Sequence, residues 1–338
     1  MNRRMGFAMA ASAALALCVS AAVAEPAQVR FASPAPAMSP ITVGGIQPWA
    51  KEVNEAAPDA IAIQVYAGPS IATFNNVYDR VTNAVVDAGF ATLGGAGLKV
   101  PKTSVVSLPF EEKNAFNESV ALWRLYDQGI MGDEYKTVHV LTLWTFPGGA
   151  IHSSKRVRTL ADVKGLKVVA SSRITGDMLE LLGAVPISSQ PTDYYPSLQR
   201  GLADAVVIGW AQVTTFKLEE VTKYHVDVSL GSTPAMTFMN NDSWAKLPDK
   251  AKETIQKFSG EPWSRRMGNI TARPPGDLPG HEIVELSDQE AAGWKARLAP
   301  ITENWLKETP DGAKVLAAYR AELAKVRAEH AKGTTVKN

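Results

Sequence analysis

The sequence predicts an α/β protein of two lobes with a helix-rich C-terminal part. The chain has 338 residues, which corresponds to about two domains at roughly 150 residues each. Segments typical of strands alternate with segments of helical periodicity over residues 28–144 and again over 160–208. This alternation predicts mostly parallel sheets covered by helices. From residue 246 onward, helical periodicity dominates.

The first half begins with QVRFAS at residues 28–33, where polar and apolar residues alternate as in a half-buried strand. The proline-rich PAPAMSP then ends that strand. The next predicted elements are helix 41–56, strand 61–66, helix 74–85, strand 86–92, helix 119–129 and strand 138–144.

The pattern restarts after the pair Gly148-Gly149. The predicted elements are turn 160–163, strand 166–170, helix 175–182, strand 184–187, helix 194–202, strand 205–208 and helices 246–258, 288–307 and 311–331. Val284 begins a strand that crosses back between the lobes. We therefore expect a first lobe of residues 25–149 plus about 238–280, and a second lobe of residues 150–237 plus about 281–338.

The first 24 residues have the features of a secretory signal peptide. Arg3 and Arg4 precede an apolar run at residues 7–19, and small residues end at Ala24 before Glu25. A membrane anchor is the alternative, but the run is shorter than the roughly 20 residues a spanning helix needs. We expect export to the periplasm with cleavage after Ala24.

Composition excludes several classes of function. Lys and Arg number 35 against 34 Asp and Glu, so no strong field attracts nucleic acid or an anionic membrane. The content of 46% hydrophobic and 20% charged residues is that of a globular protein. The only cysteine, Cys18, lies in the signal peptide, so we expect neither disulfides nor thiolate chemistry in the exported chain.

The sequence contains no recognisable catalytic, metal or cofactor motif. Five histidines are scattered without metal-ligand spacing, and His139 and His225 are expected to be structural. G-x-S-x-G, P-loop and G-x-G-x-x-G patterns are absent. A catalytic triad assembled from distant residues remains an alternative.

The most informative segment runs from residue 160 to 210. It contains Leu-x-Asp-x-Lys-Gly-x-Lys, then Leu-Gly-Ala-x-Pro, then Tyr-x-x-Leu-Gln-x-Gly-x-x-Asp. Flanking matches are FAS, VYAGPSI, VDAGFAT, SLPF and MNNDSWAKLP. This pattern resembles the substrate-binding subunit, of the dicarboxylate-binding-protein type, of tripartite ATP-independent periplasmic (TRAP) transporters. The motif residues are Leu160, Asp162, Lys164, Gly165, Lys167, Leu182, Gly183, Ala184, Pro186, Tyr195, Leu198, Gln199, Gly201 and Asp204.

The resemblance implies a two-lobed periplasmic binding protein, type II-like, with a ligand cleft between the lobes. Such a monomer captures a small solute by hinge closure and delivers it to one small and one large membrane subunit, without catalysis and without a cofactor. Two alternatives stay open: an exported enzyme with an unrecognised active site, and a module that presents its ligand to a sensor protein.

The sequence departs from the family pattern at the carboxylate clamp. Family members carry an arginine in Gly-x-Lys-x-Arg, which binds the solute carboxylate in bidentate fashion. Val169 occupies that position here, and Arg173 is the nearest replacement, although it is equally well explained as a solvated helix-start arginine. Thr92 and Gly149 stand where binders of acidic sugars have a glutamate and an arginine.

Aromatic residues are frequent where the fold presents side chains to the cleft. The candidates at strand ends are Phe90, Trp144, Phe146, Trp210 and Phe238. Phe90 and Phe238 are explained at least as well as core residues, so Trp144 and Trp210, which lie beside glycine-rich turns, are the better candidates. Flat rings favour an organic acid with an apolar or aromatic body. We expect Arg173, Ser172 and Thr92 to bind its polar end.

Overall fold

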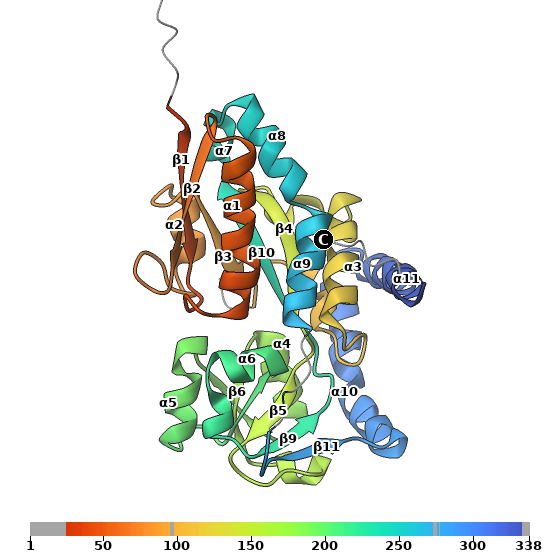
Figure 1. The fold of residues 1–338 in the computed structure, drawn as a ribbon. Helices are drawn as coiled ribbons and strands as arrows, with labels where there is room; N and C mark the ends of the chain where they lie inside the picture. The colour runs from red at the N-terminus through yellow and green to blue at the C-terminus, as the bar shows by residue number, and fades with distance from the viewer. Residues whose placement is uncertain (1–24, 95–97, 273–275, 277, 333–338) are drawn as a thin grey trace, which may run out of the picture.

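The computed structural model describes residues 25–94, 98–272, 276 and 278–332. The predicted signal peptide, residues 1–24, lies outside the described residues. The described residues form two β-sheets, each flanked by helices, and Figure 1 shows one sheet above the other. The predicted two-lobed α/β architecture is confirmed.

The sheet of the first lobe has five strands among the described residues, in the order β2-β1-β3-β10-β4. Strand β1 is parallel to β2 and β3, whereas β10 is antiparallel to β3 and β4. The strands are β1 (Ala27–Ser33), β2 (Ile61–Ala67), β3 (Ala88–Thr92), β4 (Val138–Phe146) and β10 (Thr233–Asn240). The helices are η1 (Thr42–Ile46), α1 (Gln47–Ala56), α2 (Val77–Thr82), η2 (Thr103–Ser107), α3 (Ala115–Asp127), η3 (Gly132–Tyr135), α7 (Asn241–Lys246), α8 (Asp249–Phe258) and α9 (Glu261–Thr271).

The sheet of the second lobe has six strands in the described part of the chain, in the order β11-β9-β5-β8-β6-β7. The strands are β5 (Ala150–Ser153), β6 (Lys167–Ala170), β7 (Val185–Ser188), β8 (Ala205–Ile208), β9 (Tyr224–Asp227) and β11 (Glu282–Glu285). The helices are η4 (Leu160–Val163), α4 (Arg173–Leu181), η5 (Pro191–Asp193), α5 (Tyr194–Gln199), α6 (Trp210–Thr215) and η6 (Leu218–Glu220).

The residues behind the family resemblance hold the second lobe together. Asp162 forms a capping box with Thr159 at the start of η4. Asp204 accepts a hydrogen bond from the backbone N–H of Lys167 (2.9 Å), which ties the start of β8 to β6. Gly183, at the end of α4, has a φ of +81°, a conformation that glycine adopts without strain. The residue types at these motif positions are therefore explained by their structural roles in the second lobe.

Two chain segments that cross between the lobes, residues 147–149 and 228–232, pair with each other. The Gly149 N–H donates to the Gly231 carbonyl (3.1 Å), and the Leu230 N–H donates to the Gly149 carbonyl (3.2 Å). Gly231 has a φ of +77°, and a Cβ there would lie 2.0 Å from the Ser107 carbonyl oxygen. Glycine is thus required where the hinge backbone passes η2.

The second crossing lies earlier than predicted. Strand β10 begins at Thr233 and belongs entirely to the first sheet, whereas the sequence placed the boundary near residue 238. The pairing of β10 between β3 and β4 is a long-range contact that hydropathy alone does not specify.

Helix α10 (Asp288–Glu308) connects the lobes along one side (Figure 1). The Arg297 side chain donates to the Leu181 carbonyl of the second lobe. The Trp305 Nε1–H donates to the Pro101 carbonyl of the first lobe (2.9 Å). Among the described residues, no helix is both long enough and apolar enough to cross a membrane.

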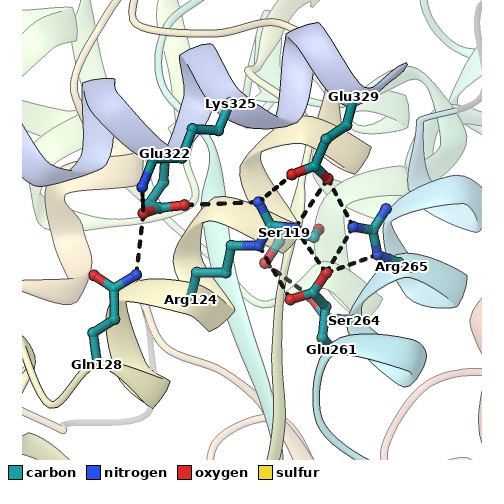
Figure 2. A network of polar contacts seen from close by, with 9 residues as sticks. All are labelled: Ser119, Arg124, Gln128, Glu261, Ser264, Arg265, Glu322, Lys325 and Glu329. Atoms are coloured by element: carbon teal, nitrogen blue, oxygen red, sulfur yellow. Dashed lines mark hydrogen bonds and ion pairs between the residues drawn. The ribbon is translucent and has the colours of Figure 1, made fainter. Parts of the chain in front are cut away.

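Helix α11 (Gly312–Ala331) lies against α3 of the first lobe, whereas the sequence grouped it with the second. Figure 2 shows the polar network that holds it there. The Arg124 guanidinium contacts Glu329 (2.9 Å) on α11 and Glu261 (3.0 Å) on α9. Arg265 also contacts both carboxylates, at 3.1 and 2.7 Å. Charge pairing across three helices therefore ties α11 to α3 and α9.

Candidate ligand-binding cleft

A cavity lies where the two lobes face each other. Its floor comes from the first lobe: Ala35, Pro36, Ser39, Pro40, Ile41, Phe74, Phe90, Thr92, Phe146, Ile270 and Thr271. Its roof comes from the second lobe: Pro191, Ala211, Gln212, Thr215 and Phe216. Because both lobes contribute, opening at the hinge separates floor from roof.

Three phenylalanine rings form the aromatic part of the floor. Phe74 meets Phe90 edge-on, with 6.1 Å between ring centroids, and Phe146 lies 6.5 Å from Phe90. Trp144 stacks behind Phe90 at 5.2 Å. Phe90 and Phe146 come from strands β3 and β4, whose packed sheet fixes their positions, whereas Phe74 comes from the segment between β2 and α2. The arrangement offers edge and face contacts to a flat apolar ligand.

The hydroxyl groups of Ser39 and Thr271 at this apolar end are already engaged within the protein. Ser39 and Thr42 share a hydrogen bond (2.9 Å), and the Thr271 hydroxyl donates to the Thr145 carbonyl (2.8 Å). None of the described residues lining this end carries a charge. Water therefore competes little with the apolar surface of a ligand for this end of the cleft.

The apolar end holds only about 30 Å³ of free space. For comparison, an engineered protein cavity of about 150 Å³ holds benzene. The roof must therefore move away from the floor before an aromatic ring enters. Entry of a ring into this space thus requires movement of the lobes.

A polar chamber of about 450 Å³ adjoins the apolar end, and Thr92, Pro191 and Gln212 line both spaces. The Gln212 side-chain oxygen accepts a hydrogen bond from the Gly209 N–H (3.2 Å) at the start of α6. Other polar groups around the chamber are Ser171, Ser172, Arg173, Asp177, Glu180, Ser188, Ser189, Gln190, Tyr194 and Thr233. The chamber therefore offers many hydrogen-bonding groups beside the apolar end.

The N-terminus of helix α4 lies at this chamber. The Ser172 hydroxyl accepts a hydrogen bond from the Thr175 N–H (3.1 Å) and caps the helix. Arg173 follows, and its side chain is 76% exposed, with long contacts to Asp177 (3.6 Å) and Glu308 (3.7 Å). The positive helix end and a weakly held guanidinium both favour an anionic group here.

Five of the eight residues expected to contact ligand line these two spaces. Phe90 and Phe146 line the apolar end, Ser172 and Arg173 line the polar chamber, and Thr92 lines both. The sequence thus placed an aromatic group and a polar group on adjoining parts of one cleft.

The other three expected residues lie elsewhere. Trp144 is fully buried behind Phe90, one layer from the cavity. Phe238 is fully buried, and its ring meets Tyr78 instead of the cavity. Trp210 begins α6, but its ring packs against His152 (4.6 Å) and lines neither space. Strand-end position alone did not determine which way these rings point.

Val169, at the position of the family's clamping arginine, is fully buried in the core of the second lobe. It packs in a cluster that includes Tyr194, Leu198 and Ile208. The charge of an arginine at this position would be buried away from solvent, which is unfavourable, so valine suits the local packing. Within the described residues, no group of three or more His, Asp or Glu side chains is placed to hold a metal ion.

Sequence reasoning missed several lining residues. Phe74 was counted only as the start of a helix, and Gln212 and Thr215 lie in a segment without a predicted element. Their position in the chain is the signal that could have found them: Phe74 follows the turn after β2, and Gln212 lies in the first turn of α6, just after β8. Loops and helix starts after strands are the usual ligand-binding positions of such sheets.

The chain matches the family model DctP, described as bacterial extracellular solute-binding protein, family 7, over residues 31–309. It is 25% identical to the C4-dicarboxylate-binding periplasmic protein DctP of Rhodobacter capsulatus, covering 96% of this chain and 99% of that protein.

Two solved structures are similar along nearly their whole length. One is a TRAP solute-binding protein of Rhodoferax ferrireducens in complex with copurified benzoate, with 26% identity, a TM-score of 0.83 and coverage of 89% of this chain and 98% of that chain. The other is a marine metagenome TRAP solute-binding protein specific for aromatic acid ligands, in complex with 3-hydroxybenzoate. Its identity is 26%, its TM-score 0.83, and coverage is 89% and 99%. The chain belongs to family 7 of the bacterial extracellular solute-binding proteins, which confirms the predicted resemblance to TRAP substrate-binding subunits.

Proposed function

We propose that this protein binds an aromatic monocarboxylate between its lobes and delivers it to the membrane subunits of a TRAP transporter. One observation carries the proposal: an uncharged aromatic floor adjoins a polar chamber beside the N-terminus of α4. The ring lies between Phe90, Phe146 and the roof on α6. The carboxylate points past Thr92 towards Ser172 and Arg173.

The relatives support this ligand class. The similar protein of Rhodoferax ferrireducens was found with benzoate, and the metagenome protein with 3-hydroxybenzoate. A linear dicarboxylate is a poorer match, because its second charge would lie at the apolar end and lose hydration without a partner.

The proposed mechanism is conformational and leaves the ligand unchanged. Contacts to floor and roof are made together only when the lobes close, so ligand shifts the population towards the closed form. The protein acts as a monomer in the periplasm after cleavage behind Ala24. N-terminal sequencing and the mass of the exported protein test these last two points.

Calorimetry and thermal unfolding with a panel of solutes test the proposal. Benzoate and 3-hydroxybenzoate are expected to bind more tightly than succinate or glucuronate. At 100 times its Kd, a solute stabilises the fold by about 2.7 kcal/mol. Tighter binding of succinate would overturn the aromatic assignment, and chemical conversion of bound benzoate would overturn the transport role.

A further inference from the structure

Three histidines form a continuous hydrogen-bonded row across the second lobe. His152 Nδ1 lies 2.8 Å from His225 Nδ1, and His225 Nε2 lies 2.9 Å from His281 Nδ1. At the inner end, His152 Nε2 lies 3.1 Å from the Ile208 carbonyl oxygen. At the outer end, His281 Nε2 lies 3.0 Å from Lys223 Nζ. We call the side chains of His152, His225, His281 and Lys223 the histidine relay.

Both ends of the relay determine where its protons lie. The Ile208 carbonyl only accepts, so His152 carries its proton on Nε2 and accepts at Nδ1. His225 must then donate from Nδ1, and His281 must donate from its own Nδ1 to His225 Nε2. The Lys223 ammonium only donates, which agrees with a bare Nε2 on His281. Every donor meets an acceptor only when all three rings are neutral.

The burial of the rings agrees with this proton arrangement. His152 and His225 are fully buried. Burial lowers the pKa of His152 to about 3 and, aided by the charges of His281 and Lys223, the pKa of His225 to about 4. Both rings are therefore uncharged near pH 7.

At the inner end of the relay, His152 contacts the backbone just before helix α6, which forms part of the cavity roof. Ile208 is the last residue of β8, and Gly209 next to it is the N-cap of helix α6. A Cβ on Gly209 would lie 2.8 Å from Pro147, so the first crossing segment confines the other side of this junction. The Trp210 ring rests edge-on against His152 (4.6 Å) and tilted against His225 (5.1 Å).

We propose that His152 is a positioning residue for ligand binding: its Nε2–H holds the Ile208 carbonyl, and thereby keeps α6 where Ala211, Gln212 and Thr215 form the roof. The proposal rests on the proposed function, because it takes this cavity as the ligand site. The hydrogen bonds of His225, His281 and Lys223 fix the sequence of donors and acceptors that leaves the His152 proton on Nε2.

A pair of matched variants separates positioning from packing. In His152→Gln the side-chain amide reaches the place of Nε2 and still donates to Ile208; in His152→Asn the amide is too short. With benzoate as the probe, His152→Asn is expected to weaken binding about tenfold more than His152→Gln, as loss of one buried hydrogen bond implies. His139→Asn, which changes a histidine stacked on Trp244 in the first lobe, is the control expected to bind normally.

Two ligand-free measurements make the test independent of the ligand assignment. Ring ¹⁵N spectra are expected to show protonated Nε2 on His152 and protonated Nδ1 on His225 and His281. Amide exchange in α6 is expected to be faster in His152→Asn than in His152→Gln. If benzoate does not bind but exchange differs in this way, the proposed function fails and the positioning role stands.

Equal benzoate affinities together with equal α6 exchange in the two variants would overturn the proposal, as would a wild-type His225 protonated on Nε2. Should neither His152 variant fold, His281→Leu tests the relay from its half-buried outer end. It is expected to move part of the His225 proton to Nε2 and to speed exchange in α6, and unchanged spectra and exchange would contradict the relay.

Discussion

The Ser232 hydroxyl donates a hydrogen bond to the carboxyl group of Glu118, which ties the second crossing segment to helix α3. The Thr145 hydroxyl, just before the first crossing segment, contacts the same carboxyl group at 3.3 Å. The buried Glu118 side chain thus contacts the second crossing segment at Ser232 and the end of β4, just before the first crossing segment, at Thr145.

Glu118→Gln tests this hinge contact through the pH dependence of stability. Burial, reinforced by the charge of Glu112, raises the pKa of Glu118 well above its usual value, so the folded protein favours the protonated form. This contribution is complete below the ordinary glutamate pKa and is lost as pH rises towards the folded-state pKa. Over that interval the wild type is expected to lose up to about 1.4 kcal/mol per pH unit relative to Glu118→Gln.

Urea unfolding of both proteins from pH 4 to pH 8 measures this difference. Parallel stability curves would show that Glu118 ionises in the folded protein as it does in the unfolded chain.

Phe146→Leu probes the aromatic floor. Replacing this ring removes aromatic contact with the ligand, and benzoate affinity is expected to fall about fivefold, in line with about 1 kcal/mol for a lost aromatic pair. Phe238→Leu is the matched control, because that ring is buried against Tyr78 away from the cavity. Calorimetry decides, and equal losses in both variants would place the ring of the ligand elsewhere.

Arg173→Gln probes the anionic end. A charge-assisted hydrogen bond contributes more than a neutral one, so benzoate binding is expected to weaken at least about tenfold and to become less sensitive to salt. Arg200→Gln, at the exposed end of α5, is the control. Unchanged affinity in Arg173→Gln would leave the carboxylate to the α4 N-terminus and the surrounding hydroxyl groups.

Arg124→Met probes the docking of α11. The change leaves Glu261, Glu322 and Glu329 close together without their shared cation. Because Arg124, Glu261 and Glu329 are only partly buried, although Glu322 is buried, the expected loss is about 1–3 kcal/mol, below that for a fully buried pair. Urea unfolding measures it, with Lys51→Met, from the exposed pair with Glu55, as the control expected to be nearly neutral. A normal stability would mean that apolar contacts alone hold α11.

Local sequence patterns predicted most elements, because strands such as Ile61–Ala67 alternate clearly and helices such as α10 carry their own capping box. They did not predict which side of a sheet a ring faces. Phe238 follows a β-bulge between Thr237 and Phe238, and this irregularity in pairing with β4 is a tertiary feature.

Long-range partners were beyond local reasoning for the same reason. The sequence grouped helix α11 with the second lobe, yet Arg124 of the first lobe binds Glu329 across 205 residues of sequence. His152 and His225 are 73 residues apart, and only the antiparallel pairing of β5 with β9 brings their rings together. At the cleft, the position of Thr92 and Arg173 on the lining could be predicted because each lies where a strand or its following turn ends.

Closure of the two lobes around an aromatic carboxylate is the central claim, and a distance between the lobes tests it most directly. Lys51→Cys on α1 and Leu202→Cys after α5 place spin labels at exposed sites of a chain whose only other cysteine, Cys18, lies in the predicted signal peptide. Pulsed electron paramagnetic resonance is expected to give a longer, broader distance distribution without ligand and a shorter, narrower one with benzoate. An identical distribution in the two samples, with calorimetry confirming that benzoate is bound, would contradict the account.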